Sequence, residues 1–122
     1  MTTNQQAWKI YEAYVEAWKP ISEEERAGIL AEVFADNVQY FTPEFKGGRE
    51  AALKDIAGFQ KKFPGAHFEV EDVSSHHDVA LLTWVLVQAD GSVLVKGHDQ
   101  IRISPQGKIT SLITFPPSVS KP

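Results

Sequence analysis

One carboxyl group stands out in this sequence because it interrupts an otherwise apolar pattern. Residues 93–103 alternate with period two, as expected for a strand with one apolar and one polar face. A carboxylate taken out of water without a partner is strongly unfavourable, so such a group is paired, hydrogen-bonded or held protonated. The acid is Asp99, and the apolar face that it interrupts is formed by Val93, Val95, Gly97, Ile101 and Ile103. The pattern therefore predicts a pocket built around Asp99.

The first half of the chain indicates three helices that would carry other walls of the pocket. Apolar residues at helical spacing predict a helix over residues 4–19, which Pro20 ends. Ser22, followed by three glutamates, is a capping box and predicts a second helix that ends near residues 36–37. Residues 49–63 have the spacing of a third helix.

The second half of the chain indicates strands. A short strand is expected before the third helix, and four longer ones follow that helix, with the residues after Phe115 frayed. This order predicts one domain over residues 1–122, in which the helices cover one face of a mainly antiparallel, curved sheet. The expected fold is an α+β roll that encloses a conical pocket, with strands over residues 38–42, 66–73, 79–88, 93–103 and 108–115.

Composition excludes several classes of function. The 122 residues include no cysteine, which removes disulfides and thiolate metal sites, and the net charge is −4 without a large basic cluster. Nucleic acid and anionic membranes are therefore not expected as partners. His76 and His77 are adjacent and would diverge on a strand, so we predict no metal site and no cofactor. The chain begins with neutral polar residues and has no long apolar run, so we expect a cytoplasmic protein.

With these elements in place, the chain resembles the nuclear transport factor 2-like (NTF2-like) superfamily, which has a cystatin-like roll. The residues that carry the resemblance are LAEVFADNV at 30–38, FPGAHFEV at 63–70, and GHD at 97–99 followed by GKI at 107–109. Among its members, the chain is similar to the small SnoaL-like polyketide cyclases and ketosteroid isomerases. The superfamily includes enzymes, binding proteins and transport factors, so the fold alone does not set an activity.

The resemblance assigns roles to particular residues. Tyr14 and Asp99 match a tyrosine and a protonated aspartic acid that form the oxyanion hole of ketosteroid isomerases. Burial among apolar neighbours would keep Asp99 protonated at pH 7. The isomerase base is an aspartate just before a proline, whereas Thr42 precedes Pro43 here, so ketosteroid isomerase activity is not expected. SnoaL-like cyclases use a pocket aspartate as acid or base, and Asp99 is its counterpart.

Other residues are candidates for the pocket, each with a simpler structural alternative. Tyr14 is either a ligand-facing donor or a core residue that satisfies Asp99. His67 is a second candidate base, although a histidine at the start of a strand is commonly a surface residue. Trp84 either offers a flat surface to a ring or fills the core. The remaining residues expected to bind substrate are Tyr40, Thr42, Phe59, Leu82, Leu86, Ile101, Leu112 and Thr114.

Three functions remain open at this stage. The first is acid–base catalysis of the cyclase or isomerase type on a small hydrophobic ketone, the second is binding of a small molecule without turnover, and the third is a structural or interaction domain. A free cavity beside Asp99 favours the first two functions, and a solidly packed cone favours the third. The outer sheet face is too apolar to stay in water and predicts a homodimer, through Leu81, Thr83, Val85, Val87, Leu94, His98, Gln100 and Arg102.

Overall fold

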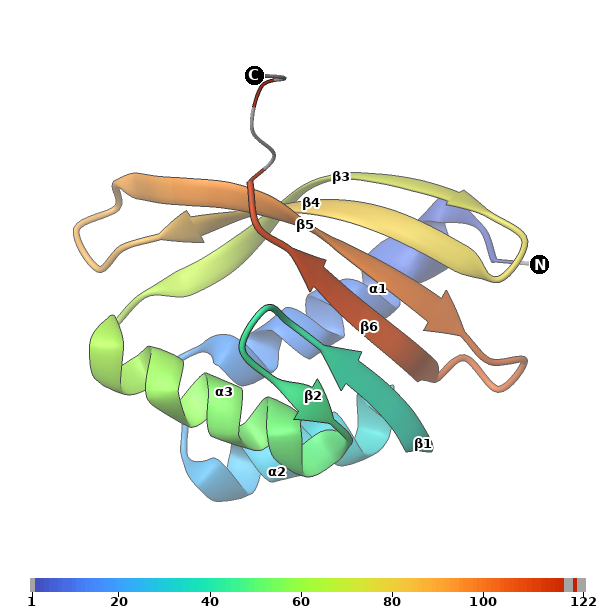
Figure 1. Ribbon diagram of the computed structural model, residues 1–122, viewed down its shortest axis with the longest axis horizontal. Helices are drawn as coiled ribbons and strands as arrows, with labels where there is room; N and C mark the ends of the chain where they lie inside the picture. The colour runs from blue at the N-terminus through green and yellow to red at the C-terminus, as the bar shows by residue number, and fades with distance from the viewer. Residues whose placement is uncertain (1, 118–119, 121–122) are drawn as a thin grey trace.

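Three helices and six strands follow one another along the chain (Figure 1). The structure is a computed structural model that describes residues 2–117 and residue 120. The frayed end expected after Phe115 therefore lies partly outside the described residues. The elements are α1 (Asn4–Val15), a 3-10 helix η1 (Glu16–Trp18), α2 (Glu23–Val33), β1 (Phe34–Phe41), β2 (Lys46–Gly47), α3 (Arg49–Lys62), β3 (His67–His76), β4 (Val79–Val87), β5 (Val93–Ile103) and β6 (Ile109–Phe115).

Capping side chains fix where the first two helices begin. Thr3 forms a capping box with Gln6 at the start of α1, and Ser22 forms one with Glu25 at the start of α2. The second box confirms the start predicted from the sequence. Helix α1 tightens into η1 after Val15, before Pro20 ends the helical path. One face of α1 is buried, and its core residues are Ala7, Tyr11, Tyr14 and Val15.

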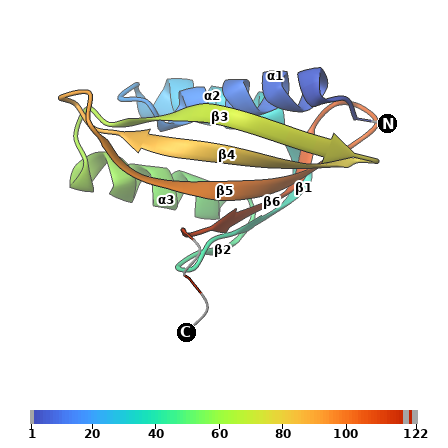
Figure 2. The ribbon, with the colours of Figure 1, turned by 90° about the horizontal axis from the view of Figure 1, so that it is seen from above.

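The six strands form a single sheet in the order β2-β1-β6-β5-β4-β3. All neighbours are antiparallel except β1 and β6, which run parallel. The three long strands β3, β4 and β5 lie side by side along the molecule (Figure 2). Strand β5 has the predicted bounds, and residues 97, 99, 101 and 103 of its inner face are buried. The alternation of the sequence therefore placed Asp99 on the correct face.

The structure corrects three boundaries. Helix α2 ends at Val33, because Phe34 is extended (φ −94°, ψ 139°) and starts β1 four residues earlier than expected. The buried residues of β1 recur with the spacing of a strand that packs on the core. Strand β3 continues to His76 because it pairs with β4 along its whole length, so the turn is confined to His77 and Asp78. The two-residue strand β2 was not predicted.

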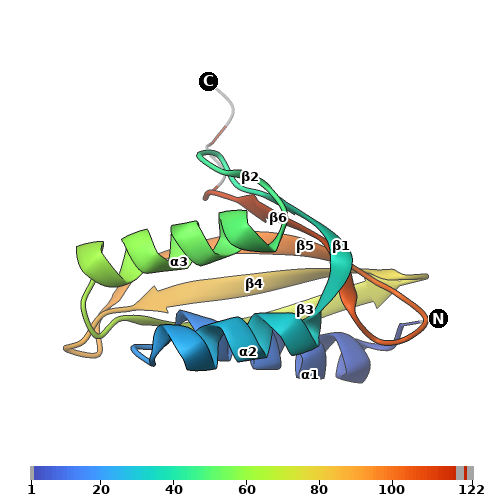
Figure 3. The same cartoon turned by 90° about the horizontal axis from the view of Figure 1, so that it is seen from below.

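The curved sheet wraps around the helices, which all lie on its concave side (Figure 3). Helix α1 packs against β3 and β4, whereas α3 packs against β1. The inner faces of α1, α2 and the sheet share one hydrophobic core. Among the described residues, no helix is long and apolar enough to cross a membrane. The space that remains between α1, α3 and the sheet holds the candidate site.

Candidate functional site

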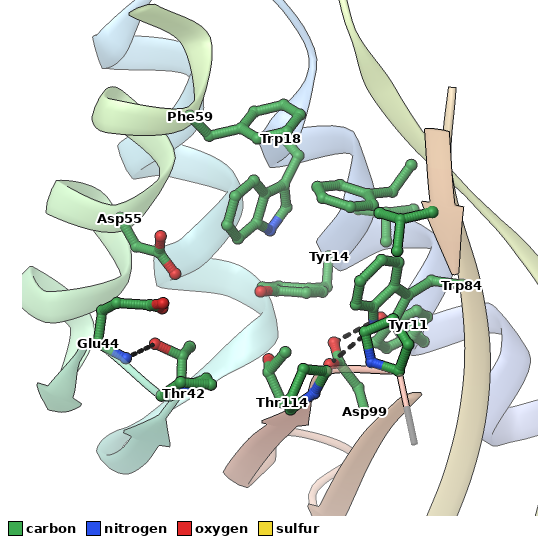
Figure 4. Close-up of a pocket in the computed structure, with 16 residues that line it drawn as sticks. Tyr11, Tyr14, Trp18, Thr42, Glu44, Asp55, Phe59, Trp84, Asp99 and Thr114 are labelled. Atoms are coloured by element: carbon green, nitrogen blue, oxygen red, sulfur yellow. Dashed lines mark hydrogen bonds between the residues drawn. The ribbon is translucent and has the colours of Figure 1, made fainter. Parts of the chain in front are cut away.

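A cavity of about 260 Å³ lies between α1, α3 and the concave face of the sheet (Figure 4). It is somewhat smaller than the pockets that hold drug-sized ligands. The cone is therefore not packed solid. A free cavity favours a ligand site over a purely structural domain. Six of the residues predicted from the sequence line the cavity: Tyr14, Thr42, Phe59, Trp84, Asp99 and Thr114.

Asp99 is held by two hydrogen bonds inside this cavity. Its side chain is almost entirely buried, with 4% exposed. The Tyr11 hydroxyl donates to Oδ2 at 2.5 Å, and the Trp84 indole N–H donates to Oδ1 at 3.1 Å. Burial raises the pKa of Asp99 to about 6, while the hydrogen bonds from Tyr11 and Trp84 and the nearby Thr114 hydroxyl restrain the rise.

The expectation that Asp99 is protonated at pH 7 is not met. A pKa of about 6 lies below that pH, so the carboxylate form predominates there. The physical reason is that both donors point at the carboxylate and stabilise its charged form. Asp99 is therefore an acceptor at neutral pH, with lone pairs to spare on each oxygen, rather than a standing hydrogen-bond donor.

A glycine lets the indole reach Asp99. Trp84 lies opposite Gly97 in the β4–β5 pairing, and Asp99 is two residues further along β5 on the same face. Diagonal neighbours of this kind are within reach of a long aromatic side chain. A Cβ atom on Gly97 would collide with the Trp84 ring and would lie 2.8 Å from the Phe115 carbonyl oxygen. The bare backbone of Gly97 is therefore what allows the ring to lie over β5.

The tyrosine that holds Asp99 is Tyr11, one turn before the expected Tyr14. Both lie on the buried face of α1, and their ring centroids are 5.5 Å apart. The Tyr14 hydroxyl points the other way, toward Asp55 (Figure 4). Trp18 and Tyr40 lie within hydrogen-bonding reach of it. Burial and the charge of Asp99 raise the pKa of Tyr14 well above its ordinary value, so this hydroxyl keeps its proton.

A second acid, Asp55 on α3, faces the cavity from the opposite wall (Figure 4). The Tyr40 hydroxyl donates to its Oδ2 at 2.5 Å. Burial raises the pKa of Asp55, the bond from Tyr40 opposes the rise, and the charge of Glu44 adds to it. Tyr40 itself is fully buried and does not line the cavity, so its role is to position Asp55 rather than to meet a ligand.

Five further residues predicted for the site lie elsewhere. His67 is on the opposite face of β3 from Phe68, which lines the cavity, because side chains alternate along a strand. The His67 ring contacts the Glu69 carboxylate at 2.8 Å in a partly exposed position. The other four are buried in the sheet and do not line the cavity: Leu82, Leu86, Ile101 and Leu112.

Thr42 lines the cavity, and its hydroxyl is hydrogen-bonded within the turn that follows β1. Its hydroxyl accepts hydrogen bonds from the backbone N–H groups of Glu44, at 3.2 Å, and Phe45, at 3.0 Å. A hydroxyl used in this way fixes the loop after β1 and directs Glu44 toward the cavity (Figure 4). The position before Pro43 therefore carries no proton acceptor for catalysis.

Several lining residues were not predicted, although three of them, Tyr11, Trp18 and Asp55, left a signal in the sequence. Tyr11, Tyr14 and Trp18 recur at helical spacing on one face of α1. Asp55 lies between Ala52 and Phe59 on the inner face of α3, which is the same kind of interruption that revealed the acid on β5. Trp18 and Phe68 pack edge to face at 5.1 Å and complete an aromatic wall that reaches Trp84.

Comparisons with known proteins agree on one family. The sequence model of the SnoaL-like domain matches residues 11–112. A SnoaL-like family protein from Agrobacterium tumefaciens, named as a candidate isomerase, has 25% identity over 93% of this chain and 99% of its own, with a TM-score of 0.84. No curated protein matches the sequence significantly.

Two other solved structures show the same fold at lower identity. An NTF2-like protein of unknown function from Exiguobacterium has 19% identity over 90% of this chain and 99% of its own, with a TM-score of 0.71. A candidate SnoaL-like polyketide cyclase from Jannaschia has 15% identity over 94% of this chain and 88% of its own, also with a TM-score of 0.71. These likenesses confirm the NTF2-like α+β roll.

Proposed function

This chain belongs to the SnoaL-like domain family, and we propose that its cavity catalyses proton transfer on a small, largely apolar ketone. The observation that carries the proposal is Asp99, a buried carboxylate with a pKa of about 6 at the wall of a free cavity. A group whose pKa lies near the working pH is suited both to take and to return a proton. Perturbed carboxyl groups in clefts are concentrated at functional sites.

In the proposed reaction, Asp99 removes a proton from the carbon next to the ketone carbonyl. The C–H bond breaks, its proton passes to the carboxylate, and its electron pair forms an enolate. The Tyr14 hydroxyl lines the cavity and keeps its proton, so it donates a hydrogen bond to the enolate oxygen. Such a donor in a dry site contributes a few kcal/mol of transition-state stabilisation.

The enolate then has two outcomes. Where a carbon–carbon double bond is conjugated with the enolate, Asp99 returns the proton to the far end of the conjugated system and completes an isomerisation. Alternatively, the enolate carbon attacks a second carbonyl group of the same molecule, a carbon–carbon bond forms, and the resulting alkoxide takes the proton from Asp99 to complete an aldol cyclisation. The candidate names of the Agrobacterium and Jannaschia proteins, isomerase and cyclase, correspond to these two outcomes. The shared first step is the part that the geometry of Asp99 and Tyr14 supports.

Deuterium exchange tests this first step without knowledge of the natural substrate. With 2-tetralone in D₂O near neutral pD, proton NMR should show loss of the signals next to the carbonyl faster than in buffer. Asp99→Asn should return exchange to the buffer rate, because an amide cannot take the proton. Asp72 lies on the exposed side of β3, so Asp72→Asn makes the same charge change outside the cavity and should leave exchange unaffected. Exchange at the buffer rate with the unmodified protein would refute the proposal.

A binding module without turnover is the second candidate, and one observation favours it. Each oxygen of Asp99 already accepts a hydrogen bond, which holds the carboxylate in a fixed position, as a recognition group requires. The same titration of 2-tetralone separates the two functions. Saturable shifts of its signals without faster exchange would establish binding alone.

A further inference from the structure

The cavity carries acidic groups without basic ones. Asp99, Asp55 and Glu44 line it, and within residues 2–117 and residue 120 no lysine or arginine does. The carboxyl groups come from β5, α3 and the loop after β1; Asp55 and Glu44 lie on one side of the cavity, and Asp99 lies on the opposite side (Figure 4). Their hydrogen-bond donors, Tyr11, Trp84 and Tyr40, are all neutral. The Asp99 carboxylate and its acidic neighbours therefore face no basic side chain among the described lining residues.

This arrangement does not suit a metal ion. In the described part of the chain, no group of three or more histidine, aspartate or glutamate side chains is close enough to ligate one ion. Carboxyl groups on two opposite walls of a cavity suit a larger ligand whose positive charge is spread over several atoms.

The other feature of the wall is its aromatic content. Six of the lining residues are aromatic, and four of their rings form a continuous series with centroid separations of 5.0 to 5.2 Å. Aromatic faces attract organic cations by about 0.5–2 kcal/mol, with the larger values in desolvated sites. The series consists of Trp18, Phe59, Phe68 and Trp84.

The third feature of the cavity is a hydroxyl group that can donate a hydrogen bond to a ligand. The Tyr14 side chain is only 2% exposed, and its hydroxyl points into the cavity between the two carboxyl-bearing walls (Figure 4). It lines the same cavity as Asp99 and Asp55 and keeps its proton, so it can donate a hydrogen bond to a bound ligand. A carbonyl oxygen on that ligand would accept this bond.

We propose that the cavity selects a small organic cation, a molecule that carries an alkylammonium group beside the carbonyl. The aromatic series would contact the apolar part of that group, and Asp55 would face its charge. The inference rests on the proposed function in taking this cavity as the ligand site. It also deepens that function, because a fixed positive charge on the substrate would offset the enolate that forms among three carboxyl groups.

Three probes of similar shape and different charge test the selectivity. Choline is a cation, 3,3-dimethylbutanol is its neutral counterpart, and 3,3-dimethylbutanoate is an anion with the same branched head. We expect the Kd of choline, measured by ligand NMR titration, to be at least about tenfold lower than that of the alcohol, with the anion weakest. Asp55→Asn keeps an acceptor for Tyr40 and should weaken choline binding by about tenfold, with less than a twofold change for the alcohol. Asp72→Asn should change neither.

Two outcomes would overturn the inference. One is binding of the alcohol as tightly as choline, and the other is absence of binding for all three probes at millimolar concentration. Neither result bears on the exchange of 2-tetralone, a neutral ketone, which reports on the proton transfer by itself. Conversely, selective choline binding without exchange of 2-tetralone would leave the cation site in place and refute the proposed catalysis. The two proposals therefore fail by different measurements.

Discussion

Replacing Asp99 by asparagine should make the folded chain more stable at pH 8, even though it removes the proposed catalytic group. The pKa of Asp99 is about 6 in the folded state and near its ordinary value of 3.8 in the unfolded chain. Between these pH values the folded state holds a proton that the unfolded state has lost. The stability of the unmodified protein therefore falls as the pH rises from 4 through 6, and the fall is complete above about pH 7.

The size of the effect follows from the two pKa values. At about 1.4 kcal/mol per unit of pKa, the difference corresponds to about 3 kcal/mol. Asparagine resembles the protonated acid at every pH. Its oxygen can accept from Trp84, and its NH₂ group can donate to the Tyr11 oxygen, so no buried polar group is left unpaired. The variant should therefore be within about 1 kcal/mol of the unmodified protein at pH 4 and about 3 kcal/mol more stable at pH 8.

Urea unfolding followed by tryptophan fluorescence at pH 4.5, 6 and 8 would measure this difference. Other groups titrate in the same range, including Asp55, whose raised pKa acts in the same direction. They are present in both proteins, so the difference between the two unfolding free energies isolates Asp99. A difference that stays constant from pH 4.5 to pH 8 would refute the reasoning, because it would mean that Asp99 titrates as an ordinary exposed acid.

Three further changes test other parts of the structure. Tyr11→Phe removes a donor that stabilises the carboxylate, so the pKa of Asp99 should rise further, as carbon NMR of the carboxyl group would show; an unchanged pKa would contradict the hydrogen bond at 2.5 Å. Gly97→Ala should displace the Trp84 ring and lower the unfolding free energy by about 1–3 kcal/mol, and unaltered tryptophan fluorescence would contradict the close packing. Nearly half of the Leu94 side chain is exposed on the outer sheet face, so we expect a dimer, with twice the 13.6 kDa monomer mass by light scattering. Leu94→Glu should return the mass to that of the monomer, and a monomeric unmodified protein would exclude the dimer.

The sheet was largely predictable because a strand sorts its residues between two faces only. A single acid on the apolar face of residues 93–103 was therefore visible in the sequence, and the structure buries Asp99 as expected. The parallel pairing of β1 with β6 could not be predicted in the same way. It joins residues about 70 positions apart, and nothing local to either strand specifies its partner.

The helical part of the site was harder to predict because a helix spreads its residues around a circle. Tyr11 and Tyr14 are one turn apart on the same buried face, and a small rotation of α1 decides which hydroxyl meets Asp99. That rotation is set by how the whole face of α1 packs against β3 and β4, which is tertiary information. The same limit applied to Asp55, whose direction depends on how α3 sits against β1.

The hydrogen-bond partners of Asp99 differ from the one expected, and they change the chemistry of the site more than its location. With Tyr14 as partner, Asp99 would have been a protonated donor at the closed end of an oxyanion hole. With Tyr11 and Trp84 as partners it is a carboxylate, and of the predicted pair of donors only Tyr14 remains a donor. Asp99 thus changes from donor to acceptor while the cavity stays where the sequence predicted it. This change accounts for a site that can remove a proton although the position before Pro43 carries no base.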